Sequence, residues 1–508
     1  MPRTLTFDSY TCISIITLKG GLGVATQLAD AGVQQGSRPK SRWWALVFLA
    51  LAQFMVVLDG TIVNLALPRL QIEMAISDST RSWVVTAYAL AFGAFLLLGG
   101  RIADFWGRKR AFIVAAVGFA IASLIGGIAQ QPWELIGARA LQGLFAALLA
   151  PAALALLTVA FPGGKDRGTA FAIFGSITGV GAAAGVLLGG FLTEHVSWRW
   201  CFFVNVPIAI IALVGVWSLV TESKAQGSTK YDWPGVVLAA LGLGSLVYGF
   251  TNAEHGWDAP EAWGFIAAGV VLMVLFVVVE RKVQHPLLPL RVATERNRAA
   301  AFLASFLSGA VLIGGILFIN FYIQIVLGFA PFLAGLASLP MTVAVIFTAG
   351  LVAKNLPKLG AKIPTAVGPV FMAAAMLWLT QVSAEGSYLV NMLPALLLMG
   401  VGLGMVFVPM QNLALFGVDK DDSGVASALV NASQQIGGSL GIALFSTIAA
   451  AAAAGGASLA ALSAGYSMVF LWAAGVAILI TPIALLLINI DRRKFTGTDG
   501  DAPVVHLG

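Results

Sequence analysis

Residues 43–63 read WWALVFLALAQFMVVLDGTIV. The stretch is long enough to cross a bilayer as one helix, because about 20 apolar residues span roughly 30 Å of hydrocarbon. Asp59 is its one charged residue, and an ionised carboxylate inside a membrane helix costs about 2.5–3.5 kcal/mol on insertion scales. The sequence therefore predicts a membrane-spanning helix in which Asp59 faces water or a polar partner and not lipid.

Composition predicts the same class of protein for the whole chain. Of its 508 residues, 59% are hydrophobic and 10% are charged, and the mean hydropathy is +0.91. A soluble domain carries about 25% charged residues, so this chain has too few to cover a water-facing surface. We expect an all-α integral membrane protein that crosses the bilayer many times.

The net charge of +6 admits two interpretations: nucleic-acid binding, or the surplus of Lys and Arg that cytoplasmic loops of membrane proteins carry. The second fits the composition, so we expect no nucleic-acid partner. Cys12 and Cys201 lie far apart, and the four histidines fall in loops or the tail. This pattern predicts neither a disulfide framework nor a metal site, and we expect no cofactor.

Fourteen stretches have the length and apolarity of membrane spans. They centre on residues 43–63, 82–101, 111–130, 134–158, 168–192, 201–220, 234–251, 263–280, 299–323, 333–353, 364–383, 388–411, 424–448 and 466–490.

The distribution of basic residues predicts the orientation. If the N-terminus is cytoplasmic, all but four of the 29 Lys and Arg fall in cytoplasmic loops and tails. The exceptions are Arg69, Arg81 and Arg199 on the other side and Arg139 within a span. One missed or added helix would mix the two sets of loops, so this asymmetry supports fourteen spans with both termini cytoplasmic.

The chain also carries signs of an internal duplication. Span two ends in GGRIADFWGRKR (99–110) and span ten in GLVAKNLPKLGAK (350–362), each a glycine followed by a short basic turn. Two six-helix bundles would place these turns in equivalent positions, which is a transporter architecture. The predicted organisation is a cytoplasmic extension at 1–42 without signal-peptide features, a first bundle at 43–220, linkers with two inserted membrane helices at 221–298, a second bundle at 299–490, and a cytoplasmic tail at 491–508.

Five motifs, in order along the chain, carry a resemblance to a known family. They are LDGTIVNLALP (58–68), WVVTAYAL (83–90), GRIADFWGRKR (100–110), RALQGLFAALLAPAALAL (139–156) and WRWCFFVNVP (198–207). Through them the chain resembles the major facilitator superfamily, in its fourteen-helix drug:proton antiporter branch, over roughly the whole membrane region. The resemblance implies a major facilitator fold and the export of drugs in exchange for protons.

Asp59 and Arg139 are the acid and the base at similar depth in the predicted spans. Counting 1.5 Å per residue puts Asp59 roughly 24 Å along span one from the cytoplasmic side. Arg139 lies roughly 8 Å below the opposite surface in span four, and a span is about 30 Å long. One interpretation, which the resemblance also implies, is that Asp59 binds the coupling proton and Arg139 tunes its proton affinity. The alternative is a structural ion pair that joins the two helices.

Asp104, Gly107, Arg108 and Arg110 lie in the predicted cytoplasmic turn after span two. Topology alone explains the arginines, but it explains neither the acid nor the glycine, which permits a tight turn. Asp104 can pair with or cap a neighbouring helix end and so hold one conformation. The resemblance implies a conformational gate at this position.

Span five contains a helix-packing motif. Gly181, Gly185 and Gly189 recur every four residues, Gly190 follows directly, and small residues at this spacing let two helices approach closely. Antiporters of the family usually carry Gly-Pro where this chain has Gly185 followed by Val186. The missing proline, which would bend the helix, favours a transporter other than a drug antiporter.

The second half carries amides inside its spans in place of acids. They are Asn320, Gln324, Asn431, Gln434 and Gln435. Each would be costly in contact with lipid, so we expect them to face a cavity or another helix. Substrate binding and hydrogen bonding between helices explain them equally well.

These features predict a proton-coupled exporter of lipophilic small molecules or drugs in the plasma or bacterial inner membrane, of the kind that confers antibiotic resistance by multidrug efflux. Its partners would be the substrate, protons and the bilayer, and no oligomer is required. The alternative on the same fold is an exporter or flippase of an endogenous lipid or metabolite, not necessarily driven by protons. A membrane enzyme would need a clustered catalytic constellation, which the sequence does not show, so we expect no enzymatic activity.

Overall fold

The computed structural model describes residues 39–162, 165–224, 232–253, 259–284, 286–418, 423–453, 456 and 458–490. The predicted extension before residue 39 and the tail from residue 491 lie outside the described residues. Every regular element within the described ranges is a helix. Fourteen helical segments are long and apolar enough to cross a membrane, as the sequence predicts.

The first six spans make up what we call the first bundle. Its helices are α2 (Pro39–Met74), α3 (Asp78–Trp106), α4 (Arg108–Ile128), α5 (Pro132–Ala160), α6 (Lys165–His195), α7 (Trp200–Phe203) and α8 (Asn205–Leu219). The short α7 and α8 together form the sixth span. They are separated because Pro207 has no amide hydrogen to donate to the carbonyl of Phe203.

The inserted pair and the last six spans follow. The inserted helices are α9 (Trp233–Asn252) and α10 (Pro260–Glu280). The second bundle consists of α11 (Leu290–Ala293), α12 (Arg296–Gly309), η2 (Ala310–Gly315), α13 (Ile316–Phe321), η3 (Tyr322–Val326), α14 (Pro331–Leu359), α15 (Lys362–Leu379), η4 (Tyr388–Met392), α16 (Leu393–Leu415), α17 (Ser423–Ala452), α18 (Leu459–Ile478) and α19 (Ile480–Leu487). The division into these units follows the sequence prediction, and its boundaries remain a prediction.

Span nine runs through α12, η2, α13 and η3 and so alternates between α-helical and π-helical turns. The π-turns of η2 pack against α17, and a Cβ atom on Gly314 would lie 2.8 Å from the ring of Phe445. A π-turn holds one residue more than an α-turn and often marks a functional position. The sequence did not predict these irregular turns, because glycines in an apolar span are equally compatible with a regular helix.

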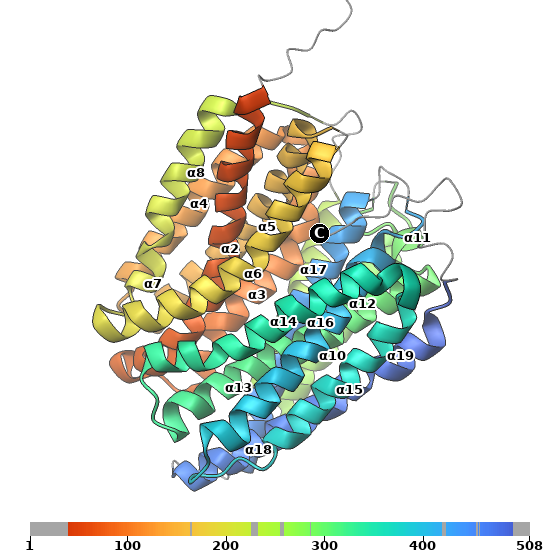
Figure 1. Ribbon diagram of the computed structural model, residues 1–508. Coiled ribbons are helices and arrows are strands. Elements are labelled where there is room, and N and C mark those ends of the chain that lie inside the picture. The colour runs from red at the N-terminus through yellow and green to blue at the C-terminus, as the bar shows by residue number, and fades with distance from the viewer. Residues whose placement is uncertain are drawn as a thin grey trace, which may run out of the picture.

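The two bundles lie side by side, and two pairs of helices form most of the contact between them. The first bundle (red to yellow-green) lies at the upper left of Figure 1 and the second (teal to blue) at the lower right. α6 packs on α14, and α3 packs on α17. The inserted α9 packs on its partner α10 and also on α3 and α17, where Thr447 donates a hydrogen bond to the carbonyl of Phe250 over 2.7 Å.

The bundles are tightly joined at one end of the spans. We call it the Asp78 end, and we call the opposite end, which holds Gly107, the Gly107 end. At the Asp78 end the backbone N–H of Phe332 donates to the Glu194 carboxylate over 2.9 Å, and the hydroxyls of Ser82 and Ser446 are 2.9 Å apart.

The α6–α14 seam opens away from the Asp78 end. A Cβ on Gly190 would lie 2.5 Å from the carbonyl oxygen of Pro331, and one on Gly335 would lie 2.8 Å from that of Val186. Further along α6, a Cβ on Gly179 would meet the side chain of Ile346 at 3.6 Å. Direct backbone packing therefore gives way to side-chain contact toward the Gly107 end, which the sequence predicts to be cytoplasmic.

Candidate functional site

Asp59 lies at the centre of a polar network inside the first bundle. Its carboxylate accepts three hydrogen bonds, from Nη1 of Arg139 at 2.6 Å, Nε2 of Gln142 at 2.8 Å and Nδ2 of Asn205 at 2.7 Å. The side chains of Asp59 and Arg139 are 0% and 1% exposed. The structure thus brings together the acid and base that the depth calculation pairs, and three donors stabilise the ionised carboxylate.

Arg139 has further partners besides Asp59. Its Nε donates to the carbonyl of Val84 over 3.0 Å, and Nη1 donates to Oε1 of Gln142 over 2.9 Å. The guanidinium carbon lies 4.3 Å from the centre of the Tyr88 ring and 6.0 Å from that of Phe202. Aromatic faces attract a buried cation, so these groups hold the guanidinium even if the carboxylate loses its charge.

Gln142 and Asn205 belong to this network, and the sequence analysis did not single them out. Gln142 also donates to the hydroxyl of Ser123 on α4 over 2.8 Å, so five helices, α2, α3, α4, α5 and α8, contribute to one centre. A signal for Gln142 exists in the sequence, since it follows Arg139 by one helical turn. Asn205 stands in the WRWCFFVNVP motif, but depth alone does not tell which side of its span faces Asp59.

The turn at Gly107 joins α3 to α4 with a sharp reversal. Gly107 has φ of +128°, a conformation that a side chain disfavours. Across this turn Arg108 donates to Oδ1 of Asp104 from Nε at 3.0 Å and from Nη2 at 2.9 Å. The structure therefore places the predicted gate residues together, with Asp104 paired inside its own turn and Arg110 at the start of α4.

Glu222, which follows α8, is a residue of this turn that sequence reasoning missed. Its carboxylate accepts hydrogen bonds from the backbone N–H groups of Lys109 and Arg110, both at 3.0 Å. An anion at a helix N-terminus satisfies free amide donors and the helix dipole. A Cβ on Gly107 would lie 2.8 Å from the same carboxyl group, so the turn, the start of α4 and the end of α8 form one unit.

The predicted glycine motif is the surface on which α6 contacts two different helices. A Cβ on Gly181 would lie 3.2 Å from Val57, one on Gly185 would lie 2.9 Å from the carbonyl oxygen of Leu58, and one on Gly189 would lie 2.5 Å from that of Ile62. These three residues face α2, whereas Gly190 faces α14. α6 therefore connects the helix that carries Asp59 to the seam between the bundles.

The five amides of the second half do not form one site. Asn320 is buried, and its Oδ1 accepts a long hydrogen bond from Ser338 at 3.5 Å. The nearby Nε2 of Gln324 is buried without a partner. The other three lie on α17, and the residue counts from the starts of spans nine and thirteen separate the two groups by roughly 20 Å in depth.

The amides on α17 differ from one another in environment. Asn431 is exposed and donates to the carbonyl of Ser427 on its own helix over 3.2 Å. Gln434, with Ser305, Ser308 and Gln411 among its neighbours, lines a small cavity of about 10 Å³, the size of one water molecule. Gln435 lies at the α3 seam, where a Cβ on Gly93 would approach it to 3.3 Å.

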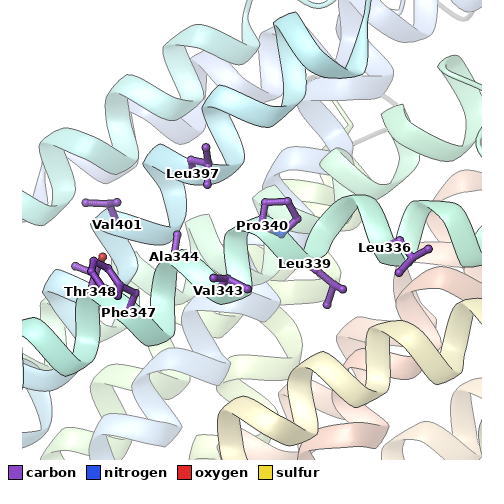
Figure 2. Close-up of a pocket in the computed structure, with 9 residues that line it drawn as sticks. All are labelled: Leu336, Leu339, Pro340, Val343, Ala344, Phe347, Thr348, Leu397 and Val401. Carbon is purple, nitrogen blue, oxygen red and sulfur yellow. The ribbon is translucent and has the colours of Figure 1, made fainter.

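An apolar groove on the second bundle includes none of these residues in its lining. It has a volume of about 570 Å³ and is lined by α14 and α16, with Phe347 68% exposed at its edge. Figure 2 shows its lining: Leu336, Leu339, Pro340, Val343, Ala344, Phe347, Thr348, Leu397 and Val401. The lining is apolar except for Thr348, so the groove suits hydrocarbon and offers no group for acid–base chemistry. In the part of the chain that the structure describes, no group of His, Cys, Asp or Glu could hold a metal ion.

Fourteen spans in two bundles around a buried charge pair have the architecture of a membrane transporter. The family model that describes the Major Facilitator Superfamily matches residues 49–442. The chain belongs to the Major Facilitator Superfamily, as the motifs in the sequence predict.

Relatives of known name support the same class. The puromycin resistance protein pur8 of Streptomyces alboniger is 42% identical over 487 residues, which cover 94% of this chain and 96% of the relative. The cephamycin export protein CmcT of Amycolatopsis lactamdurans is 35% identical, with coverage of 89% and 93%. The crystal structure of the nucleoside transporter NupG superposes with a TM-score of 0.64 at 12% identity, with coverage of 88% and 100%, which shows the shared fold.

Proposed function

We propose that the protein is a proton-coupled exporter of lipophilic small molecules in which Asp59 binds the coupling proton and Arg139 controls its affinity. The observation that carries this proposal is the sealed ion pair at the centre of the first bundle. Ionisable groups inside membrane segments are costly and usually serve transport. Relatives named for puromycin resistance and cephamycin export support the export of antibiotics as the physiological task.

Protonation of Asp59 is compatible with the contacts around it. A neutral carboxyl group no longer compensates the charge of Arg139, and an unpaired buried cation is costly. Arg139 retains the carbonyl of Val84, the amide oxygen of Gln142 and the face of Tyr88. The guanidinium can therefore stay in place while the proton enters and leaves, which a proton carrier requires.

A route for coupling runs from Asp59 through α6 to the seam between the bundles. Leu58 precedes Asp59 and packs its carbonyl against Gly185 of α6, and Thr61 also contacts this glycine. One turn further, Gly190 packs against Pro331 of α14, and Glu194 holds the N-terminus of that helix. A shift of α2 on protonation would thus reach the contacts that close the Asp78 end.

Transport into everted membrane vesicles tests this proposal, with puromycin as the first substrate. We expect a pH gradient, acidic inside, to drive uptake by the wild-type protein. Asp59→Asn should lower this uptake by about tenfold or more, because one proton per cycle supplies about 1.4 kcal/mol per pH unit and the variant cannot bind it. Glu261→Gln, an exposed acid at the start of α10, serves as the matched control and should transport normally. Wild-type rates in Asp59→Asn would exclude Asp59 as the proton site.

A second candidate function is the movement of an endogenous lipid, and the exposed groove on α14 and α16 favours it. Its volume of about 570 Å³ and its apolar lining fit an acyl chain better than a soluble antibiotic. Measurement of lipid leaflet exchange in proteoliposomes distinguishes the two functions. Exchange that continues without a pH gradient, and that is unchanged in Asp59→Asn, would support the lipid function.

A further inference from the structure

Two acidic residues of the inserted helices are buried at the Gly107 end, and the transport proposal does not use them. Asp232 immediately precedes α9 and Glu280 is the last residue of α10. They are 5% and 3% exposed. Buried acids in contact with neither water nor a base are costly, so their surroundings require an explanation.

The two carboxyl groups face each other. A Cβ placed on Gly235 would lie 2.6 Å from Oδ2 of Asp232 and 2.7 Å from Oε1 of Glu280, so both oxygens converge on one point. Neither of these two oxygens has a hydrogen-bond donor. Two ionised carboxylates cannot hydrogen-bond to each other, because both only accept. One proton shared between them would satisfy both oxygens and remove the repulsion between two negative charges.

The other oxygen of each carboxyl group holds a backbone amide. Oδ1 of Asp232 accepts from the N–H of Gly235 over 2.9 Å and so caps α9. Oε2 of Glu280 accepts from the N–H of Leu288 over 3.0 Å. Leu287 beside it is buried against Val236 of α9 and Leu98 of α3. The pair therefore fixes the connection between α10 and the second bundle to the inserted helices.

The basic residues near this connection are directed elsewhere. Arg101 of α3 donates from Nη2 to the carbonyl of Pro286 over 3.2 Å and lies over the ring of Phe105. Arg281 and Lys282, which follow α10, are exposed. Within the described ranges, no ion pair includes Asp232 or Glu280. Among the described residues, a second negative charge in the pair would thus lack a compensating cation, and one shared proton removes that charge.

We infer that Asp232 and Glu280 form a second proton-binding site, which holds one proton between them and docks the segment at Leu287 and Leu288 onto α9 and α3. Loss of the proton leaves two adjacent buried carboxylates that repel each other. Their separation releases the N–H of Leu288 and exposes Leu287. Since the connection leads into α11 and α12, the pH at the Gly107 end would then act on the second bundle through a path that does not involve Asp59.

Hydrogen exchange of the purified full-length protein in lipid nanodiscs tests this site. After correction for intrinsic exchange rates, we expect wild-type peptides that cover 281–290 to exchange about fivefold faster or more at about pH 9, where the pair has lost its proton, than at about pH 6, where it holds the proton. Glu280→Gln should show slow exchange at both values, because its amide donates permanently to Asp232. Glu261→Gln, at the other end of α10, should behave as the wild type does.

A second readout keeps the inference testable if Glu280→Gln folds poorly. Infrared spectroscopy of the wild-type protein near neutral pH should show the C=O stretch of a protonated carboxyl group. Asp232→Asn should remove this band, and Asp59→Asn should leave it unchanged, which separates this site from the transport proposal. An exchange profile that is the same in wild type and Glu280→Gln, or a band that survives in Asp232→Asn, would overturn the inference.

Discussion

The two bundles differ in how they hold polar groups inside the membrane. The first buries a complete ion pair, Asp59 with Arg139, and surrounds it with hydrogen-bond partners from five helices. In the described part of the second bundle no charged side chain is buried, and its buried polar groups are hydroxyls and an amide such as Asn320. Charge compensation is thus concentrated in one half of the molecule.

The backbones differ as well. The π-helical segments η2, η3 and η4 all belong to the second bundle, whereas the spans around Asp59 are α-helical apart from the break before Pro207. A buried ion pair requires rigid surrounding helices, because small displacements of its charges in a low dielectric are costly. We propose from this difference that the first bundle binds protons and that the second contacts varied neutral substrates.

Removal of Arg139, the base of the buried ion pair, should have the largest effect on stability. Arg139→Ala leaves the Asp59 carboxylate buried without a cation, and we expect a loss of about 3–5 kcal/mol in unfolding free energy. Thermal denaturation in detergent measures it. The double variant Asp59→Asn with Arg139→Gln should regain much of the loss, since it removes both charges. A double variant as unstable as Arg139→Ala would show that packing, and not charge, causes the effect.

Loss of a neutral member of the network should have a smaller effect. Asn205→Leu removes one hydrogen bond to a charged acceptor, which contributes about 1.5–3 kcal/mol, and so should reduce pH-driven uptake while the protein remains folded. Initial rates in vesicles, normalised to protein amount, check this. The matched change in the second bundle is Asn412→Leu, because the Asn412 amide donates to the carbonyl of Val408 in its own helix. Equal losses in the two variants would remove the distinction between the bundles.

The contact that links Asp59 to the seam can be tested with a small side chain. Gly185→Ala would push a methyl group into Thr61 and the carbonyl of Leu58, and overpacking costs about 1–3 kcal/mol. We expect slower transport with unchanged substrate binding. Gly350→Ala on α14 is the control, because no atom lies within 4 Å of the added Cβ. Normal transport by Gly185→Ala would show that α2 and α6 do not move as one unit.

The smallest effect should come from the exposed amide of the second bundle. Asn431→Ala removes a hydrogen-bonding group worth about 1 kcal/mol, so KM should rise by about fivefold for substrates that hydrogen-bond to it. The dependence of uptake on the pH gradient should not change. A panel of antibiotics compared at two pH gradients measures both quantities. An altered gradient dependence would indicate that the second bundle also takes part in proton coupling.

Much of the fold follows from the sequence because the bilayer imposes it. Length and apolarity fix fourteen spans, and the structure has helices at each of them. Depth along a span is also determined by residue counting, which is why the sequence alone predicts that Asp59 and Arg139 pair. The π-helical turns at η2 and η3 could not be predicted, because η2 packs against α17 and η3 against α18 and α14, and local composition does not reveal these contacts.

The rest of the site needed the three-dimensional arrangement. Asn205 contacts Asp59 because of the rotation of its span about the helix axis. Residue counting gives the depth of a residue but not this rotation. Glu222 lies far along the chain from the turn it stabilises, so only the folded positions of α4 and α8 connect them. The sequence analysis grouped the five amides of the second half by residue type. In the structure they lie at two different depths in the membrane.

The π-turns of span nine affect the direction in which its later side chains point around the helix axis. Each one holds an additional residue relative to an α-helical frame, and each residue of an α-helix turns the chain by about 100°. A change of Ala310–Gly315 to a regular α-helix with all its residues kept would rotate everything after it by about that angle, whereas deletion of one residue there would allow a regular helix with the later residues still in phase. The direction in which Asn320 and Gln324 point is thus set by the number of residues before them as much as by their identity.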